Sequence, residues 1–319
     1  MRYRALAAAF LLIGLTGIAT AQYPARAIRI VSPFSAGGAS DTITRVVAQV
    51  ISQNTGQAVI VENKAGAGGR IGYDSVAKAA PDGYVFAVTD STFTMMPSLY
   101  STLPWGDNDA LVPAATMAQT PFVVMVNPRF KLDTLQALVA FAKENPGKLN
   151  FGSAGIGSIN HIVTELFQRE AGIKLTHIPY GGMGEAVNGM LTGSVDLLIH
   201  TVAGGAPQIN SGQAIGLAVT DRRRSAVLPN IPSAPEAGIP GLIAGNLFGL
   251  TAPKGTPSEA IVWMDREVRK ALQTDVVKAR LSALGATALE LSPAEYGALI
   301  HDETTRWGSI IGAANIHVE

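Results

Sequence analysis

A strand, a glycine-containing turn and an amphipathic helix follow one another twice in this sequence, at residues 28–53 and 149–167. This arrangement aims the free N–H groups and the positive dipole end of the helix at one point. Each copy is therefore a predicted seat for an anion, and two copies suggest two lobes that face one ligand. Apolar residues recur at the same offsets in both helices, which gives each helix one buried face: Ile43, Val46, Val47, Val50 and Ile51 in the first, and Ile159, Ile162, Val163, Leu166 and Phe167 in the second.

The N-terminus has the features of a secretory signal peptide, which we assign to residues 1–21. Two arginines precede an apolar run at residues 5–18, and residues 19–21 read A-T-A, which fits an A-x-A cleavage site. The apolar run is too short for a stable membrane span. We therefore expect an exported protein, cleaved after Ala21 so that the mature chain begins near Gln22.

Composition removes several classes of function. Of 319 residues, 47% are hydrophobic, which is enough for a large core without disulfide bonds. Without Arg2 and Arg4 the chain keeps 22 basic and 24 acidic residues, a net charge of −2, so no basic excess favours nucleic acid. Cysteine is absent, which excludes zinc and iron–sulfur sites built on thiolates.

The order of predicted elements gives an α/β protein with two lobes. Strands at 28–31, 57–63 and 84–92 alternate with helices, which predicts a first lobe with a largely parallel sheet. A second unit repeats the pattern, with strands at 121–127, 149–153, 174–179, 195–201 and 214–220 and helices at 134–144, 158–171, 184–192 and 205–211.

The last part of the chain is predicted to return to the first lobe. A lone strand at 246–253 precedes three helices, and we expect the C-terminal helix to pack on that lobe. The chain would cross between the lobes near 121–127 and near 246–253. We therefore assign 22–122 and 250–319 to lobe 1 and 123–249 to lobe 2, with the crossing strands as a hinge beside a cleft.

Catalytic and metal-binding motifs are absent from the sequence. There is no G-x-S-x-G elbow, and no histidine pair has H-x-x-x-H spacing, so we predict neither a metal nor a cofactor. Ser158 stands where an N-cap hydroxyl belongs, Asp41 also suits a helix cap, and the glycine run at 66–72 is interpreted as a structural turn. Arg222, Arg223 and Arg224 are interpreted as a solvated turn.

The loops at the predicted strand ends hold no Lys or Arg. A carboxylate bound there would rest on backbone N–H groups, Ser and Thr hydroxyls and helix N-termini. This chemistry suits reversible capture of a small anion, since no strong ion pair would trap it. The loops are residues 33–41, 89–93, 153–158, 179–184 and 200–205.

Long ordered segments of the sequence carry a family resemblance: YPARAIRIVSPFSAGGASD, VENKAGAGGRIGYDSVAKAAPDGY, NPGKLNFGSAGIGSINH, HIPYGGMGEAVNGMLTGSVDLL and LFGLTAPKGTP. This resemblance is to the Bug family, the periplasmic substrate-binding proteins of the tripartite tricarboxylate transporter system. It implies a type II periplasmic-binding-protein fold that closes on a small carboxylate, a non-enzymatic and monomeric receptor, and a membrane permease as partner. A dicarboxylate, aliphatic or aromatic, is the expected ligand.

The resemblance also implies which residues bind the carboxylate. The first loop would contribute Phe34, Ser35, Gly38, Ala39 and Asp41, and the second lobe would contribute Ser153, Ala154, Gly155, Gly157, Ser158 and His161. The other end of the ligand would meet Ser91, Thr92, Tyr180, Gly182, His200 and Thr201. Two positions depart from the family pattern: Gly181 replaces a frequent lysine, and His200-Thr201 replaces a frequent Asp-Asn pair.

Two other functions remain open from the residues alone. A ligand sensor for a membrane kinase would use the same cleft and the same closure. An exported hydrolase of small esters would rest on Ser153, Ser158 and His161, which are close in sequence.

Overall fold

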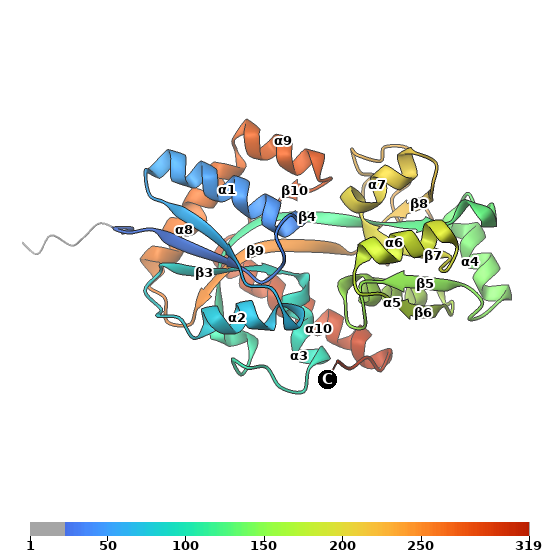
Figure 1. Cartoon of the computed structure of the whole chain (residues 1–319), viewed down its shortest axis with the longest axis horizontal. Coiled ribbons are helices and arrows are strands. Elements are labelled where there is room, and N and C mark those ends of the chain that lie inside the picture. Colours follow the sequence, from blue (N-terminus) through green and yellow to red (C-terminus); the bar gives the residue numbers. More distant parts are fainter. Residues whose placement is uncertain (1–22, 319) are drawn as a thin grey trace, which may run out of the picture.

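The computed structural model describes residues 23–318, so the predicted signal peptide lies outside the described residues (Figure 1). None of the helices within this range is long and apolar enough to cross a membrane. The first part of the chain forms β1 (Ile28–Ser32), α1 (Ala39–Thr55), β2 (Val59–Asn63), α2 (Arg70–Ala77), β3 (Val85–Asp90), α3 (Ser91–Leu99) and β4 (Leu111–Val126).

The remaining elements complete the second unit and then return to the first. The second unit holds α4 (Leu135–Glu144), β5 (Asn150–Ser153), α5 (Ile159–Ala171), β6 (Thr176–Pro179), α6 (Met183–Thr192), β7 (Leu197–Thr201), α7 (Val202–Asn210) and β8 (Ile215–Val219). The returning segment holds β9 (Gly245–Pro253), α8 (Ser258–Leu272), α9 (Asp275–Ala283), β10 (Thr287–Ala288) and α10 (Pro293–Ala313).

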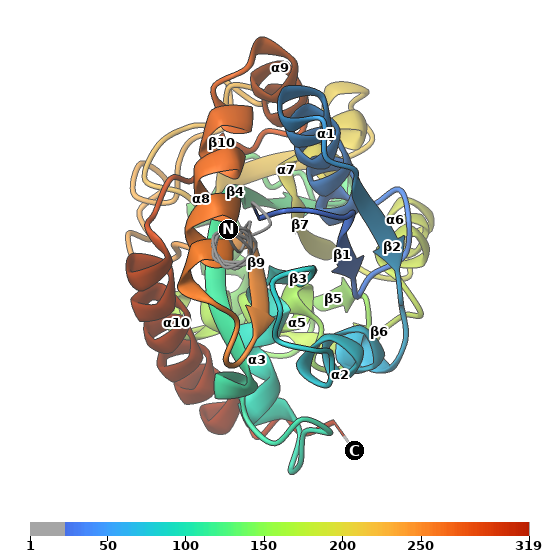
Figure 2. The ribbon, with the colours of Figure 1, turned by 90° about the vertical axis from the view of Figure 1, so that its left-hand side faces the viewer.

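One curled, mixed sheet runs through both lobes in the order β2-β1-β3-β9-β4-β7-β5-β6, with β10 and β8 also paired to β4. Pairing is parallel within β2-β1-β3 and within β7-β5-β6, and antiparallel where β9 and β4 join them. β4 pairs with β9 up to Pro121, with β7 from Phe122 and with β8 from Val123. Figure 1 shows β4 running from one lobe into the other, and Figure 2 shows helices around the sheet of the nearer lobe.

Two elements differ from the prediction. The strand predicted at 84–92 ends at Asp90, because the Asp90 carboxylate accepts the N–H of Thr92 at 2.9 Å and caps the unpredicted helix α3. β4 begins at Leu111, ten residues before the strand predicted at 121. Most of its residues are buried, so no alternation of polar and apolar residues marks this strand in the sequence.

The C-terminal helix packs on more than the lobe that was predicted. α10 lies against α3 and β4, and three of its residues, Trp307, Ile310 and Ile311, also enter the hydrophobic core around α5 and β7. Trp307 is fully buried there. The prediction was therefore incomplete, since α10 joins the two lobes as a third connection beside β4 and β9.

Candidate functional site

The carboxyl ends of the parallel strands of the two lobes point toward one another along β4. The end of β3, Asp90, lies opposite Phe248 of β9, which lies opposite Ala118 of β4. The end of β7, Thr201, lies opposite Phe122 of β4. Ala118 and Phe122 are four residues apart, which is about 13 Å along an extended strand. The loops after both sets of strands therefore converge on one region, the usual place for a ligand in an open α/β sheet.

The buried carboxylate of Asp41 holds the loop between β1 and α1 in place. Asp41 accepts hydrogen bonds from the Gly37 N–H at 3.0 Å, from Asn63 Nδ2 at 2.8 Å and from Arg45 Nε at 3.0 Å. Burial opposes ionisation of Asp41, but hydrogen bonds from Arg45, Gly37 and Asn63 keep its pKa below the ordinary value. The Asp41 carboxylate therefore positions the loop.

At the start of α1, the backbone N–H groups of the same loop have no capping side chain. Gly38 is the N-cap, and no side chain caps the helix. Ser35, Gly37 and Gly38 are exposed, whereas Phe34 and Ala39 are half-buried. The hydroxyls of Ser32 and Ser40, on either side of the loop, are buried without a hydrogen-bond partner among the described residues. Free N–H groups at a helix start, with small hydroxyls beside them, suit an anion.

The loop between β5 and α5 is built from hydrogen bonds within itself. Ser158 caps α5 as predicted, accepting the His161 N–H at 3.4 Å and donating to Gly155 O at 2.7 Å. Ser153 is fully buried, and its Oγ accepts the Gly155 N–H at 3.1 Å. Gly155 and Gly157 have φ of 112° and 76°, which L residues with side chains rarely adopt. This loop, residues 153–158, is called the serine-glycine loop below.

Sequence reasoning missed His177, which lies on β6 directly beneath this loop. Its Nε2 lies 2.7 Å from Ser153 Oγ, and its ring stacks on His161 with 3.8 Å between centroids. Phe151 also packs against the His177 ring, with 4.7 Å between centroids, and lies 5.9 Å from the His161 ring. Pairing the predicted strands 149–153 and 174–179 in parallel sets Phe151 opposite His177, so the register was the one signal available.

The residues predicted to contact the other end of the ligand differ in their solvent exposure and in whether their polar groups are already hydrogen-bonded. Ser91 is fully buried and holds the start of β9, since its Oγ donates to Gly245 O at 3.1 Å and accepts the Leu247 N–H at 2.9 Å. Thr92, Tyr180, Gly182, His200 and Thr201 are half-buried. Gly182 is the N-cap of α6 without a capping side chain, so α6 offers another free helix start.

His200 is uncharged at neutral pH. Its Nδ1 accepts the Thr201 N–H at 2.9 Å, which requires a lone pair on that nitrogen. Burial lowers the pKa of His200 to about 4. At the position where many relatives are expected to have a carboxylate, this chain therefore presents a neutral imidazole.

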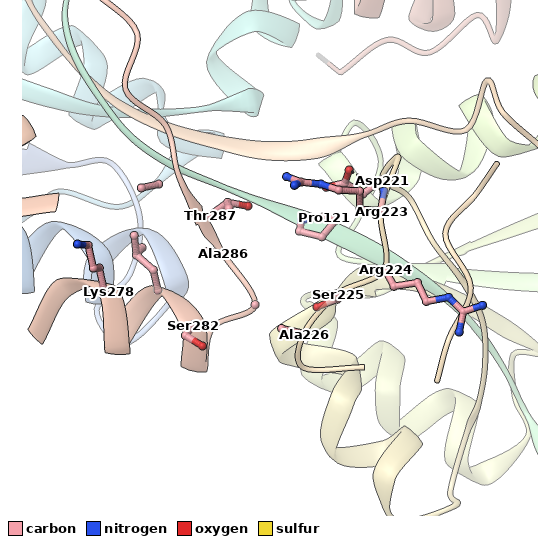
Figure 3. Close-up of a pocket in the computed structure, with 13 residues that line it drawn as sticks. Pro121, Asp221, Arg223, Arg224, Ser225, Ala226, Lys278, Ser282, Ala286 and Thr287 are labelled. Carbon is pink, nitrogen blue, oxygen red and sulfur yellow. Dashed lines mark hydrogen bonds between the residues drawn. The ribbon is translucent and has the colours of Figure 1, made fainter. Parts of the chain in front are cut away.

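A groove of about 410 Å³ lies elsewhere between the lobes, beside Pro121 of β4 (Figure 3). Lys278 and Ser282 of α9 line one wall, and the turn that follows β8 lines the other. None of the predicted ligand residues lines this groove. Arg222, Arg223 and Arg224 are exposed, as a solvated turn requires, and Arg224 pairs with Glu236 at 2.9 Å.

The serine–histidine pairing considered for an ester hydrolase is not the one that forms. The hydroxyl of Ser153 is buried and lies beside His177, not beside His161 as an ester hydrolase would have required. Desolvation and the neighbouring His161 lower the pKa of His177 to about 4, which makes it a weak base. Within residues 23–318, no cluster of three or more His, Asp or Glu side chains could hold a metal ion.

A family model and a related protein sequence both match this chain over most of its length. Residues 43–316 match the family described as the tripartite tricarboxylate transporter family receptor. Protein BugT of Bordetella pertussis is 37% identical over 314 residues, which cover 97% of this chain and 96% of BugT.

Two solved structures extend the comparison to proteins with bound ligands. R. palustris Rpa4515 with adipate has a TM-score of 0.82 and 28% identity, covering 93% of this chain and 100% of that one. MatC (Rpa3494) from Rhodopseudomonas palustris with bound malate has a TM-score of 0.75 and 28% identity, covering 91% and 100%.

Two α/β lobes joined by crossing strands, with strand ends and helix starts directed at one region, define a solute-binding receptor of the periplasmic-binding-protein fold. The match over most of the sequence then gives the family. This chain belongs to the tripartite tricarboxylate transporter receptors, the family of the Bug proteins.

Proposed function

We propose that this receptor captures a small dicarboxylate between its lobes and delivers it to the permease of a tripartite tricarboxylate transporter. One carboxylate would rest on the N–H groups at the start of α1, beside Ser35 and Gly38. The serine-glycine loop and the start of α5 would face it from the other lobe. Export by cleavage near Ala21 belongs to the same proposal.

The convergence of strand ends from both lobes on residues 118–122 of β4 is the observation that supports this function most directly. A ligand there would touch both lobes, so it would favour the closed state by the difference between its affinities for the two states. Bending within β4 and β9 would carry the motion, since these strands run between the lobes.

A ligand with two anionic groups suits a pair of helix starts without capping side chains, those of α1 and α6. α1 and α6 lack capping side chains, and they belong to different lobes. The related proteins whose structures are solved with adipate and with bound malate both hold dicarboxylates. Without Lys or Arg in these loops, each carboxylate would be held by N–H groups and hydroxyls alone, which permits rapid release to a permease.

Thermal-shift and calorimetric titrations of ligand-stripped protein test the ligand class. Adipate and hexanoate form a matched pair, because both have six carbons and differ in one carboxylate. We expect adipate or malate to stabilise the protein by about 2.7 kcal/mol at one hundred times its Kd. Equal stabilisation by hexanoate, or no response to any di- or tricarboxylate, would contradict the dicarboxylate assignment.

Delivery is tested with membrane vesicles that contain the cognate permease. Labelled dicarboxylate should enter the vesicles only when the loaded receptor is added. Uptake that is independent of the receptor would remove the transport role and leave a sensor role to be examined.

A further inference from the structure

Two stacked histidines support both ends of the serine-glycine loop. His177 Nε2 bonds Ser153 Oγ at 2.7 Å where the loop begins, and His161 Nδ1 accepts the Gly157 N–H at 3.2 Å near its end. The rings lie 3.8 Å apart and are tilted by only 17°. One pair of rings therefore sets the distance between the two ends of the loop.

The hydrogen bonds determine which nitrogens carry protons. His161 Nδ1 must hold a lone pair, because it accepts the N–H of Gly157. Ser153 Oγ accepts the Gly155 N–H and lies 3.0 Å from Gly155 O. All three contacts of this hydroxyl are satisfied when neutral His177 donates Nε2–H to Ser153 and Ser153 donates its proton to Gly155 O.

Both rings of the stack lie among other side chains. His161 is 6% exposed, and the ring of Phe151 packs against that of His177 with 4.7 Å between centroids. The charged group that faces the pair is Glu165, whose Oε1 lies 3.6 Å from His161 Nε2. A proton added at His161 Nδ1 would place a donor against the Gly157 N–H, and the loop would lose that bond.

We propose that His161 and His177 are positioning residues, and that the pair holds the serine-glycine loop in its binding shape only while His161 Nδ1 carries no proton. This inference rests on the proposed function for its ligand, but it reverses the role first predicted for His161. A histidine that contacts a carboxylate binds it better when protonated, whereas this pair would bind it less well. By linkage, ligand binding then favours the unprotonated state of the ring that accepts the Gly157 N–H.

The ligand-free protein provides the first test, by NMR and amide hydrogen exchange. His161→Phe keeps a stacked ring and removes the acceptor of the Gly157 N–H, and His177→Phe keeps a stacked ring and removes the donor to Ser153 Oγ. We expect the Gly157 amide in the first variant, and the Gly155 amide in the second, to exchange about tenfold faster. The control is His301→Gln, an exposed position on α10 that should leave both amides unchanged. Unchanged exchange in both phenylalanine variants would overturn the proposal.

The second test follows the His161 imidazole nitrogens by NMR as pH is lowered, with and without saturating adipate. A titration midpoint that moves to lower pH with adipate supports a positioning role, and a midpoint that rises or stays fixed contradicts it. If adipate does not bind, malate takes its place. If neither binds, the dicarboxylate assignment fails, while the exchange experiment still decides the role of the stack.

Discussion

Asn63 Nδ2 donates to Asp41 Oδ1 at 2.8 Å and to Phe34 O at 3.0 Å, which ties the end of β2 to the loop that begins α1. Arg45 Nη2 completes the group by donating to Asn63 Oδ1 at 2.6 Å. The first predicted anion-binding loop is therefore held by Asn63, Asp41 and Arg45, which can do so without touching the ligand.

Asp41→Asn should weaken both folding and binding. The Asp41 carboxylate accepts hydrogen bonds from Gly37, Arg45 and Asn63, and the residue is only 4% exposed. An asparagine would replace one carboxylate oxygen with an NH2 group, which would then face a donor. We expect a loss of about 1–3 kcal/mol in the free energy of unfolding, measured by urea denaturation. A variant with unchanged stability would show that the loop does not depend on this carboxylate.

Gly38→Leu should separate binding from stability. A Cβ at Gly38 meets only Ser35 O at 3.9 Å, and its φ of −71° suits any residue. The cost to folding should be about 1 kcal/mol, as for a poor N-cap residue. The side chain would cover the N–H groups at the start of α1, so calorimetry should detect no carboxylate binding.

Gly312→Leu is the matched control for Gly38→Leu, because it is exposed on α10 and a Cβ there meets nothing within 4 Å. It should bind ligand normally. Retained binding by Gly38→Leu would place the carboxylate away from α1.

Stability should depend on pH through three groups, one buried and two half-buried, with opposite effects. His177 and His200 have pKa values lowered to about 4, so between pH 6.5 and 4 the unfolded chain takes up protons that the folded protein does not, and stability falls with pH. Burial raises the pKa of Asp90 to about 6, so its ionised carboxylate destabilises the folded state above pH 6. As the pH falls below 6, protonation of Asp90 removes this cost and partly offsets the loss of stability caused by the histidines.

Asp90→Asn isolates the contribution of that carboxyl. An asparagine still caps α3, and it carries no charge. The variant should gain stability over the parent at pH 7, and the difference should disappear near pH 4, as chemical denaturation across this range would show. A constant difference at all pH values would mean that Asp90 does not titrate in this range.

Trp307 offers a test of the connection that α10 makes between the lobes. Its side chain is fully buried, and its indole N–H has no partner among the described residues. Trp307→Ala should cost about 3–5 kcal/mol, whereas Trp307→Phe should cost much less because no hydrogen bond is lost. Similar losses in both variants, measured by denaturation, would show that the indole N–H has a partner such as buried water.

The sequence predicted the elements whose pattern is local. α1 and α5 were found from apolar spacing, and Ser158 was recognised as a cap because an N-cap hydroxyl acts within its own turn. α3 was missed because one capping carboxylate, Asp90, redirects a segment that reads as a strand. The length of β4 was missed because both of its faces are covered by other elements.

The sequence predicted which loops form the candidate site, but it did not predict which side chains hold those loops in place. Glycines and hydroxyls marked the positions where an anion is expected, and the resemblance supplied residue numbers. The roles of Asp41, Ser91 and Ser153 in holding loops depend on partners brought by tertiary structure, such as Asn63, Gly245 and His177. No spacing along the chain reveals such pairs, except through the register of neighbouring strands.

The return of the chain to lobe 1 has a consequence for synthesis. β3, near the start, is completed by β9, and the core around α1 is closed by residues of α8 and α9 near the end. While the ribosome is still making the last quarter of the polypeptide, the first lobe lacks a neighbour for β3 and a cover for α1. The first lobe can therefore complete its core only late in synthesis or after the chain is released.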